Sequence, residues 1–244
     1  MKYRATLQYD GTRYHGWQRQ GNTANTIQGK VEEVLSRLTG DFVEVQGAGR
    51  TDAGVHALGQ VVSFHLAQNI PAQELQDQLN RYLPGDIAAI TVDVAEERFH
   101  ARLNATGKIY RYSLRLGKIP DVFRRQYEVQ VEAPLNLAAM KRAASYLTGR
   151  QDYRSFCGNR RFQKSTIRTV WDISFQQHGN ALDVIFHGTG FLPYMVRILM
   201  GTLLEVGMGQ RDADTMPTIL SACDRAAAGN TAPAQGLTLV QVEY

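Results

Sequence analysis

Hydrophobic positions in residues 1–94 switch between a period of two and a period of 3.6, the spacings of strands and of amphipathic helices. The pattern predicts strands at residues 3–9, 42–46, 60–66 and 87–94, and helices at residues 26–38 and 71–83. Asn25 and Gln28 resemble a capping box at the start of the first helix, and Pro71 opens the second. The resulting order, β-α-β-β-α-β, is that of a ferredoxin-like, split βαβ lobe.

The rest of the chain follows a related but looser order. The pattern predicts strands at residues 105–116, 168–177, 181–187 and 237–243, and helices at residues 136–147, 191–206 and 212–226. We therefore predict an α+β chain of two related ferredoxin-like lobes, with domains at residues 1–100 and 101–244. Their antiparallel sheets are expected to join around a central cleft.

Composition is typical of a soluble globular protein. The 244 residues are 43% hydrophobic and 20% charged, which excludes general disorder. No apolar run approaches the ~18–20 residues that span a bilayer, and the N-terminal MKYRATLQYDG alternates like a strand rather than a secretory signal. Cys157 and Cys223 are too few for a disulfide scaffold and wrongly spaced for a zinc cluster. We expect a cytoplasmic protein.

Charge is distributed unevenly along the chain. The formal net charge is only +4, but residues 98–168 carry 16 basic and 4 acidic side chains, a local net charge of +12. The remaining residues carry a net charge of −8, and 21 of the 27 basic residues are Arg, which suits phosphate contacts and stacking on bases. This distribution favours a polyanionic partner. The alternative is that these basic residues scatter over several faces and are neutralised by acids elsewhere.

The densest group of unusual residues is the segment from Gly47 to Ala57, GAGRTDAGVHA, between two predicted strands. Its glycines permit close approach of another backbone, as a substrate-facing loop requires. Asp52 is its only carboxylate, and Arg50, two residues earlier, can keep that carboxylate ionised. The alternative is a tight turn in which Asp52 caps local amides and Arg50 forms a surface ion pair.

Several blocks of the sequence resemble, in the same order, those of the TruA family of tRNA pseudouridine synthases. The longest is GAGRTDAGVHALGQVVSF, which contains Asp52. The others are Tyr9–Gln20 (YDGTRYHGWQRQ), Leu83–Ile87 (LPGDI), Phe99–Arg102 (FHAR), Tyr110–Tyr112 (YRY) and Met195–Arg197 (MVR). The resemblance covers nearly the whole chain.

The resemblance implies an enzyme that isomerises uridine to pseudouridine at positions 38, 39 and 40, in the anticodon arm of tRNA. It implies that Asp52 is the catalytic nucleophile. The residues agree with this chemistry, because a single carboxylate can attack or assist while the base departs and returns. Hydrolytic glycosidases usually place two carboxylates around the bond, and this loop offers one.

Two further catalytic residues follow from the resemblance. Tyr110 matches the family's active-site tyrosine, which would stack on the uracil and take part in proton transfer. Its alternative role is packing with Tyr112 on one face of a strand. Ile109 departs from the family, which often has Arg before this tyrosine. Arg197 matches the family's basic residue and would pair with Asp52, with Arg50 in a supporting role, and the alternative for both is a surface ion pair.

The expected RNA surface combines basic residues for phosphates with aromatic residues for bases. Its candidates are Arg13, Tyr14, Trp17, Arg19, Gln20, His56, Arg98, His100, Arg102, Arg111, Arg160 and Arg161. Trp17 can equally be a core residue.

Cofactors and metals are not expected. The six His residues form no HExxH motif or Cys/His cluster, and neither a GxGxxG nor a Walker loop is present. The resemblance implies a homodimer with tRNA contacting both protomers. Two other classes of function remain open: a non-catalytic RNA-binding or chaperone module, and a glycosidase-like hydrolase that uses Asp52 and His56.

Overall fold

The computed structural model describes residues 1–159 and 161–244. Contacts divide the chain into two units, one of Met1–Thr106 with Thr238–Tyr244, the other of Gly107–Leu237. The predicted boundary at residue 100 therefore differs from this division mainly in the final strand, which groups with the first unit. No helix within the described residues combines the length and apolar composition required to cross a membrane.

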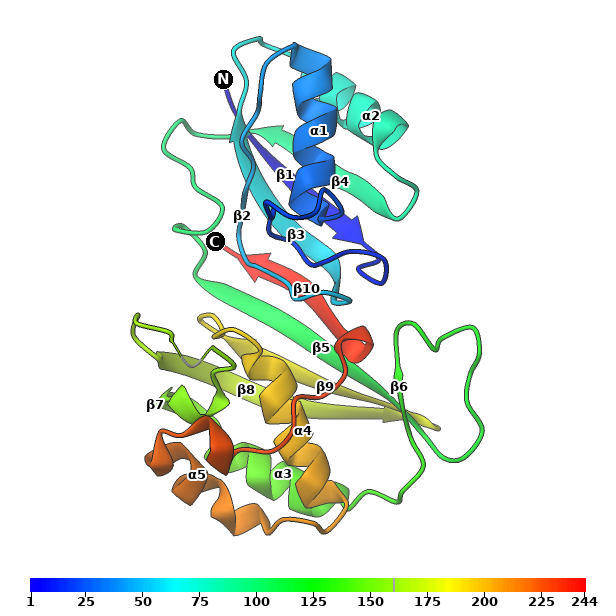
Figure 1. Ribbon diagram of the computed structural model, residues 1–244, viewed down its shortest axis with the longest axis vertical. Coiled ribbons are helices and arrows are strands. Elements are labelled where there is room, and N and C mark those ends of the chain that lie inside the picture. Colours follow the sequence, from blue (N-terminus) through cyan, green and yellow to red (C-terminus); the bar gives the residue numbers. More distant parts are fainter. Residues whose placement is uncertain (160) are drawn as a thin grey trace. The chain divides into compact units, whose positions relative to one another are not determined.

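The first unit has the predicted order of elements (Figure 1). They are β1 (Lys2–Tyr9), α1 (Ile27–Thr39), β2 (Gln46–Gly47), β3 (His56–His65), α2 (Ala72–Tyr82), β4 (Ile87–Val94) and β10 (Leu237–Glu243). The strand order is β4-β1-β3-β10, with β2 paired to β3, and β1 is antiparallel to both neighbours. This is the arrangement expected of a split βαβ lobe.

The last strand reaches the first unit because its backbone pairs with β3. Thr238 and Leu239 lie in parallel register with His56 and Ala57. Gly59 permits the approach, since a Cβ at this position would lie 2.5 Å from the carbonyl oxygen of Val240. The strand predicted at residues 237–243 is confirmed, and its partner is a strand from the start of the chain.

The core of the first unit forms between the sheet and its two helices. Along β1 every second residue, from Tyr3 to Tyr9, is buried. The α1 stripe of Ile27, Val31 and Leu35 is fully buried, and α1 packs against α2. Such apolar burial is the main driving force for forming the lobe.

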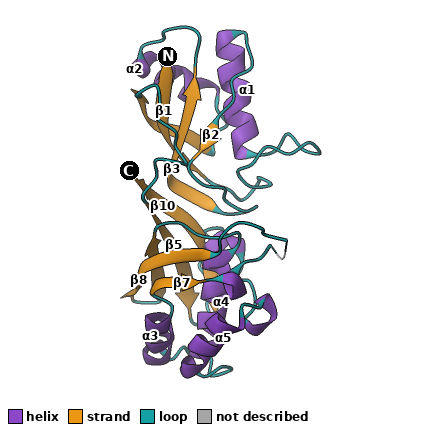
Figure 2. Cartoon of the chain, turned by 90° about the vertical axis from the view of Figure 1, so that its left-hand side faces the viewer, coloured by secondary structure: helices purple, strands orange, loops and turns teal. Residues whose placement is uncertain are grey.

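The second unit also combines antiparallel strands with helices (Figures 1 and 2). Its strands are β5 (Gly107–Leu116), β6 (Val129–Val131), β7 (Gly149–Asp152), β8 (Ile167–His178) and β9 (Ala181–Gly188), in the order β5-β9-β8-β7 with β6 on β5. Its α-helices are α3 (Leu137–Tyr146), α4 (Met195–Gly207) and α5 (Met216–Ala222). Short 3₁₀ turns lie at Arg154–Phe156, Ala213–Thr215, Arg225–Ala227 and Ala234–Gly236. The α+β class predicted from the sequence is confirmed.

The predicted strand at residues 42–46 is wrong for most of its length, because β2 is only Gln46–Gly47. Val43 and Val45 are buried like strand residues. Their N–H groups, however, donate to side chains of α1: Val43 to Ser36 Oγ (2.9 Å) and Val45 to Glu32 Oε1 (3.1 Å). Side chains therefore satisfy the backbone donors that a strand ladder would otherwise satisfy.

Three helix predictions also need correction. The N-cap of α1 is Thr26, whose hydroxyl accepts the Gly29 N–H, whereas Asn25 donates to the Arg13 carbonyl. Helix α4 begins at Met195 instead of residue 191, because Tyr194 adopts a left-handed conformation with φ 61°. Of the helix predicted at residues 212–226, only Met216–Ala222 is α-helical, and Cys223 ends it at φ 48°.

Candidate active-site loop and its surroundings

Asp52 lies in the segment that joins β2 to β3, where the sequence places it. Its side chain is half-buried, Arg50 is exposed, and Thr51 between them is buried. The Val55 N–H donates to the Asp52 carbonyl at 3.1 Å, and Gly54 has φ 79°, so the chain turns sharply after Asp52. The carboxylate therefore projects from a bend whose preceding residue is anchored in the protein interior.

Buried groups hold two of the three residues before Asp52, namely Gly49 and Thr51. The Tyr9 hydroxyl lies 2.9 Å from Thr51 Oγ1, and the Thr51 carbonyl accepts the Trp17 N–H at 3.0 Å. The Gln60 amide donates to the Gly49 carbonyl at 2.8 Å and accepts the Gly49 N–H at 3.3 Å. Burial raises the pKa of Tyr9 to about 12, so its phenol stays protonated at neutral pH.

The segment of residues 10–17 lies against the other side of this loop. A Cβ at Gly11 would lie 2.0 Å from the Val55 carbonyl oxygen, and one at Gly16, whose φ is 89°, would lie 2.7 Å from the Thr51 carbonyl oxygen. His56 is buried, and its Nδ1 lies 3.1 Å from both the Gly11 nitrogen and Asp10 Oδ1. The Gly11 N–H donates to His56 Nδ1, and Asp10 Oδ1 accepts the Thr12 N–H and hydroxyl. At positions 11 and 16 only glycine fits against the Asp52 loop, because any Cβ would overlap a backbone carbonyl oxygen.

Tyr110 lies in β5 of the second unit. It pairs in register with Phe186 of β9 and packs edge-on against Phe191, with ring centroids 5.3 Å apart. Tyr110 is 7% exposed and lies on the same strand face as Tyr112, which is fully buried. Both packing and substrate contact are thus compatible with its position.

Arg197 lies in the first turn of α4, also in the second unit. Its Nε donates to the Ala232 carbonyl at 2.8 Å, and its guanidinium carbon lies 5.5 Å from the centre of the Tyr194 ring. Burial raises the pKa of Tyr112, and the charge of Arg197 lowers it in part. Arg197 is therefore held in place by its own unit, and its pairing with Asp52 stays a prediction.

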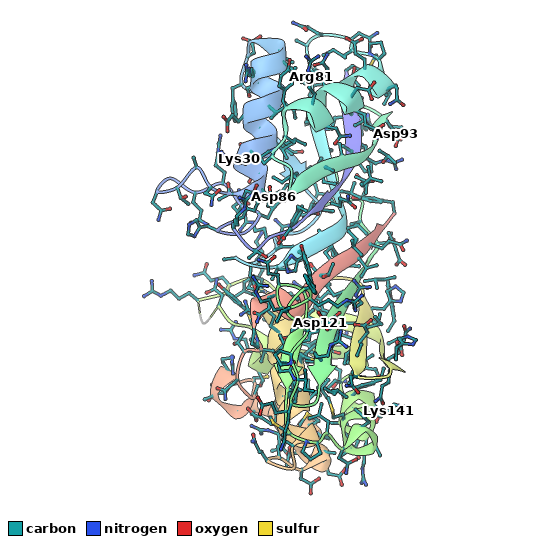
Figure 3. All side chains as sticks on the ribbon, turned by 90° about the vertical axis from the view of Figure 1, so that its right-hand side faces the viewer. Lys30, Arg81, Asp86, Asp93, Asp121 and Lys141 are labelled. Carbon is teal, nitrogen blue, oxygen red and sulfur yellow. The ribbon has the colours of Figure 1, made fainter. Side chains whose placement is uncertain are left out.

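Arg13 and Tyr14 share one carboxylate. Arg13 Nε donates to Asp86 Oδ2 at 3.0 Å, and the Tyr14 hydroxyl donates to Asp86 Oδ1 at 2.5 Å. Asp86, labelled in Figure 3, immediately precedes β4. Burial and this carboxylate both raise the pKa of Tyr14. The Arg13 guanidinium is exposed, whereas the Tyr14 ring is buried.

Trp17, Arg19 and Gln20 follow along the same segment. Trp17 is 2% exposed and packs against Tyr9, with ring centroids 6.2 Å apart, so it occupies the core. Arg19 is exposed, and its guanidinium carbon lies 4.9 Å from the centre of the exposed Phe42 ring. The Gln20 amide donates to the His15 carbonyl at 2.9 Å.

The remaining RNA candidates lie in both units. Arg98 and Arg102 are exposed, and His100 is half-buried, with Nδ1 accepting the Arg102 N–H at 3.1 Å. Arg111 in β5 is half-buried, and its Nε has no hydrogen-bond partner within the described residues. Arg161 is exposed, whereas Arg160 lies outside the residues that the structure describes.

Sequence reasoning missed the buried polar residues around the Asp52 loop, namely Tyr9, Thr51 and Gln60. One signal was present: Gln60 has the same strand parity as the buried Val62 and Phe64, and an inward-facing amide needs a partner. Residues 1–159 and 161–244 contain no group of three His, Cys, Asp or Glu side chains arranged to hold a metal ion.

Comparison with known proteins supplies independent information. A family model described as tRNA pseudouridine synthase matches residues 5–104 and 143–244, which include Asp52 and Arg197 but not Tyr110. Proteins named tRNA pseudouridine synthase A are 45% identical in Brevibacillus brevis, over 100% of this chain and 99% of the relative, and 43% identical in Acetivibrio thermocellus, over 98% and 97%. A chain in the crystal structure of a Cbf5-Nop10-Gar1 complex gives a TM-score of 0.40 at 12% identity. The match covers 97% of this chain and 48% of that one.

Proposed function

This chain belongs to the tRNA pseudouridine synthase family, and we propose that it isomerises uridine to pseudouridine at positions 38, 39 and 40, in the anticodon arm of tRNA. The observation that carries the proposal is the match of both the family model and full-length relatives across the Asp52 loop. In the reaction the C1′–N1 bond of uridine breaks, the uracil turns, and a C1′–C5 bond forms.

Asp52 is the proposed nucleophile. It is the only carboxylate between Gly47 and Ala57, and a single carboxylate suits a reaction in which the same base leaves and returns. The alternative hydrolase needs His56 as a second functional group. His56 is buried, and its Nδ1 accepts the Gly11 N–H, which argues against that role.

Tyr110 and Arg197 are proposed on the family resemblance. Tyr110 supplies an aromatic ring for the extruded uracil and a hydroxyl for proton transfer at C5. Arg197 supplies a cation that keeps the catalytic carboxylate ionised, and Arg50 supports it. The bonds from Arg197 to Ala232 and the packing of Tyr110 on Phe191 support these assignments, because each side chain is held in a defined position.

The proposed tRNA surface consists of those RNA candidates whose basic side chains are exposed. In the first unit these candidates are Arg13, Arg19, Arg98 and Arg102, and in the second Arg161. The +12 charge of residues 98–168 supports contact with a polyanion. We further infer a cytoplasmic homodimer in which tRNA contacts both protomers, since the family resemblance implies it and two-fold symmetry would present two basic segments to one RNA.

Release of tritium from C5-labelled uridine in unmodified tRNA tests the proposal. We expect the wild-type protein to release tritium and Asp52→Ala to release none. Equal release by the two proteins would overturn the role of Asp52. Binding of tRNA without base change would instead indicate an RNA-binding module, and free uracil among the products would indicate a hydrolase. Mapping pseudouridine in tRNA from cells that lack the gene then tests positions 38, 39 and 40.

A further inference from the structure

A buried polar network lies directly behind the Asp52 loop. It consists of Tyr9, Thr51 and Gln60, which are 4%, 6% and 0% exposed. Tyr9 and Gln60 come from adjacent strands, β1 and β3, and Gln60 Nε2 lies 3.5 Å from the Tyr9 hydroxyl. The side chains therefore form one connected group, which we call the Tyr9–Thr51–Gln60 network.

The side chain of Gln60 also bonds the backbone of the loop. Its amide bonds both the carbonyl and the N–H of Gly49, as a neighbouring strand would. One residue earlier, the Ala48 N–H still donates to the Val61 carbonyl at 2.8 Å. The Gln60 side chain thus continues the backbone pairing at the point where the loop turns away from β3.

Thr51 is held from two directions. Its hydroxyl contacts Tyr9, and its carbonyl accepts the Trp17 N–H. Its peptide bond leads directly to Asp52, so these contacts restrict the backbone from which the catalytic carboxylate extends.

Stability alone does not explain a polar network at this place. Pairs of buried polar groups can often be replaced by apolar groups of the same shape with little loss of stability. A connected network, in contrast, fixes the relative positions of its members. We propose that Tyr9, Thr51 and Gln60 are positioning residues that orient the Asp52 carboxylate for attack. This inference rests on the proposed function of Asp52.

A positioning role makes a specific kinetic prediction. The network is buried, so its loss does not remove a contact with tRNA and leaves the Kd unchanged. It lowers the rate of the chemical step, because small displacements of a reacting group cost up to about 100-fold in rate. A purely structural role would lower the thermal stability without changing the rate of the folded enzyme.

The experiment compares substitutions that remove one oxygen atom. Tyr9→Phe breaks the network, whereas Tyr3→Phe removes an equally buried hydroxyl, bonded to the carbonyl and N–H of Ile70, from the same strand. Thr51→Val removes the loop hydroxyl, and Thr51→Ser keeps it. Single-turnover tritium release at saturating tRNA, tRNA Kd and thermal unfolding are measured for each folded variant.

We expect Tyr9→Phe and Thr51→Val to react at least about tenfold more slowly at unchanged Kd, and Tyr3→Phe and Thr51→Ser to stay within about threefold of wild type. A wild-type rate for Tyr9→Phe, or an equal loss in Tyr3→Phe, would overturn the inference. If Thr51→Val does not fold, the two Tyr variants decide. Asp52→Ala separates the two proposals: an active Asp52→Ala overturns the proposed function itself, whereas an inactive one beside a fully active Tyr9→Phe overturns only the positioning role.

Discussion

Glu32 of α1 lies with its carboxylate buried beneath the guanidinium of Arg19, with Oε2 3.2 Å from Nη1. The Glu32 side chain is 3% exposed and that of Arg19 51%. The other carboxylate oxygen, Oε1, accepts the Gln28 amide and the Val45 N–H. One buried acid therefore connects α1 both to the segment before β2 and to Arg19, a proposed RNA contact.

Glu32→Gln is expected to destabilise the first unit. The amide keeps the shape but cannot act as the charged acceptor for Gln28, Val45 and Arg19, so the free energy of unfolding falls by about 1.5–3 kcal/mol. Glu33→Gln in the same helix disrupts only the exposed pair with Lys30 and costs at most about 1 kcal/mol. Urea unfolding measures both, and equal losses would contradict the assignment of Glu32.

Gly11→Ala is expected to impair folding and activity together. Its new methyl group would overlap the Val55 carbonyl, so the segment of residues 10–17 must move away from the Asp52 loop. We expect a loss of about 1–3 kcal/mol in stability and slower tritium release. Gly21→Ala adds a methyl group that meets no atom within 4 Å, and it provides the control. Wild-type melting of Gly11→Ala would show that the two segments do not pack as described.

Alkaline pH is expected to destabilise the protein through its buried tyrosines. Tyr9 has its pKa raised from 10.0 to about 12, so its stabilising effect is complete below pH 10 and is lost as pH rises through 12. Two pKa units correspond to about 3 kcal/mol. Burial raises the pKa of Tyr14, Tyr112, Tyr153 and Tyr244 in the same direction.

The substitution Tyr9→Phe isolates the contribution of Tyr9 to the loss of stability at alkaline pH. Urea unfolding at a series of alkaline pH values is expected to give a fall in stability smaller than that of wild type by roughly the Tyr9 contribution, about 3 kcal/mol. Parallel curves for the two proteins would show that Tyr9 ionises as readily in the folded state as in the unfolded state.

Arg13→Ala is expected to weaken tRNA binding and its dependence on salt. If Arg13 contacts one phosphate, its loss lowers the slope of log Kd against log salt by about 0.7–1. Arg4→Ala is the matched control, because Arg4 likewise pairs with an aspartate, Asp93 of β4, and is not among the proposed RNA contacts. Filter binding over a salt series distinguishes the two variants. Equal slopes for Arg13→Ala and wild type would show that Arg13 does not belong to the proposed tRNA surface.

Hydrophobic periodicity predicted most of the fold because most elements bury one regular face. The strand at residues 87–94 and the final strand at 237–243 coincide with β4 and β10. Periodicity failed where side chains replace backbone partners, as at Val43 and Val45. It also failed at the start of α4, where the exposed Tyr194 adopts a left-handed backbone conformation that a hydrophobic period does not indicate, so the helix begins only at Met195.

The sequence predicted the position of the candidate site but not the buried side chains that hold its loop. The motif located Asp52 in a loop between two strands, and the structure places it there. The side chains behind the loop come from distant positions, as Tyr9 and Gln60 do, and their partners are fixed by strand register rather than by local spacing. Membership of the RNA surface was likewise not predictable from the motif, since the candidates Tyr14, Trp17 and His56 are buried.

The parallel pairing of β10 with β3 has a consequence for biosynthesis. The strand that follows the Asp52 loop gains its neighbour at Thr238 and Leu239 only after the ribosome has translated the whole of Gly107–Leu237. A nascent chain thus carries Asp52, the proposed nucleophile, long before the sheet beside it is complete. Premature termination anywhere in the second half leaves His56 and Ala57 at the start of β3 without this neighbour, and truncated products are expected to be inactive and prone to aggregation.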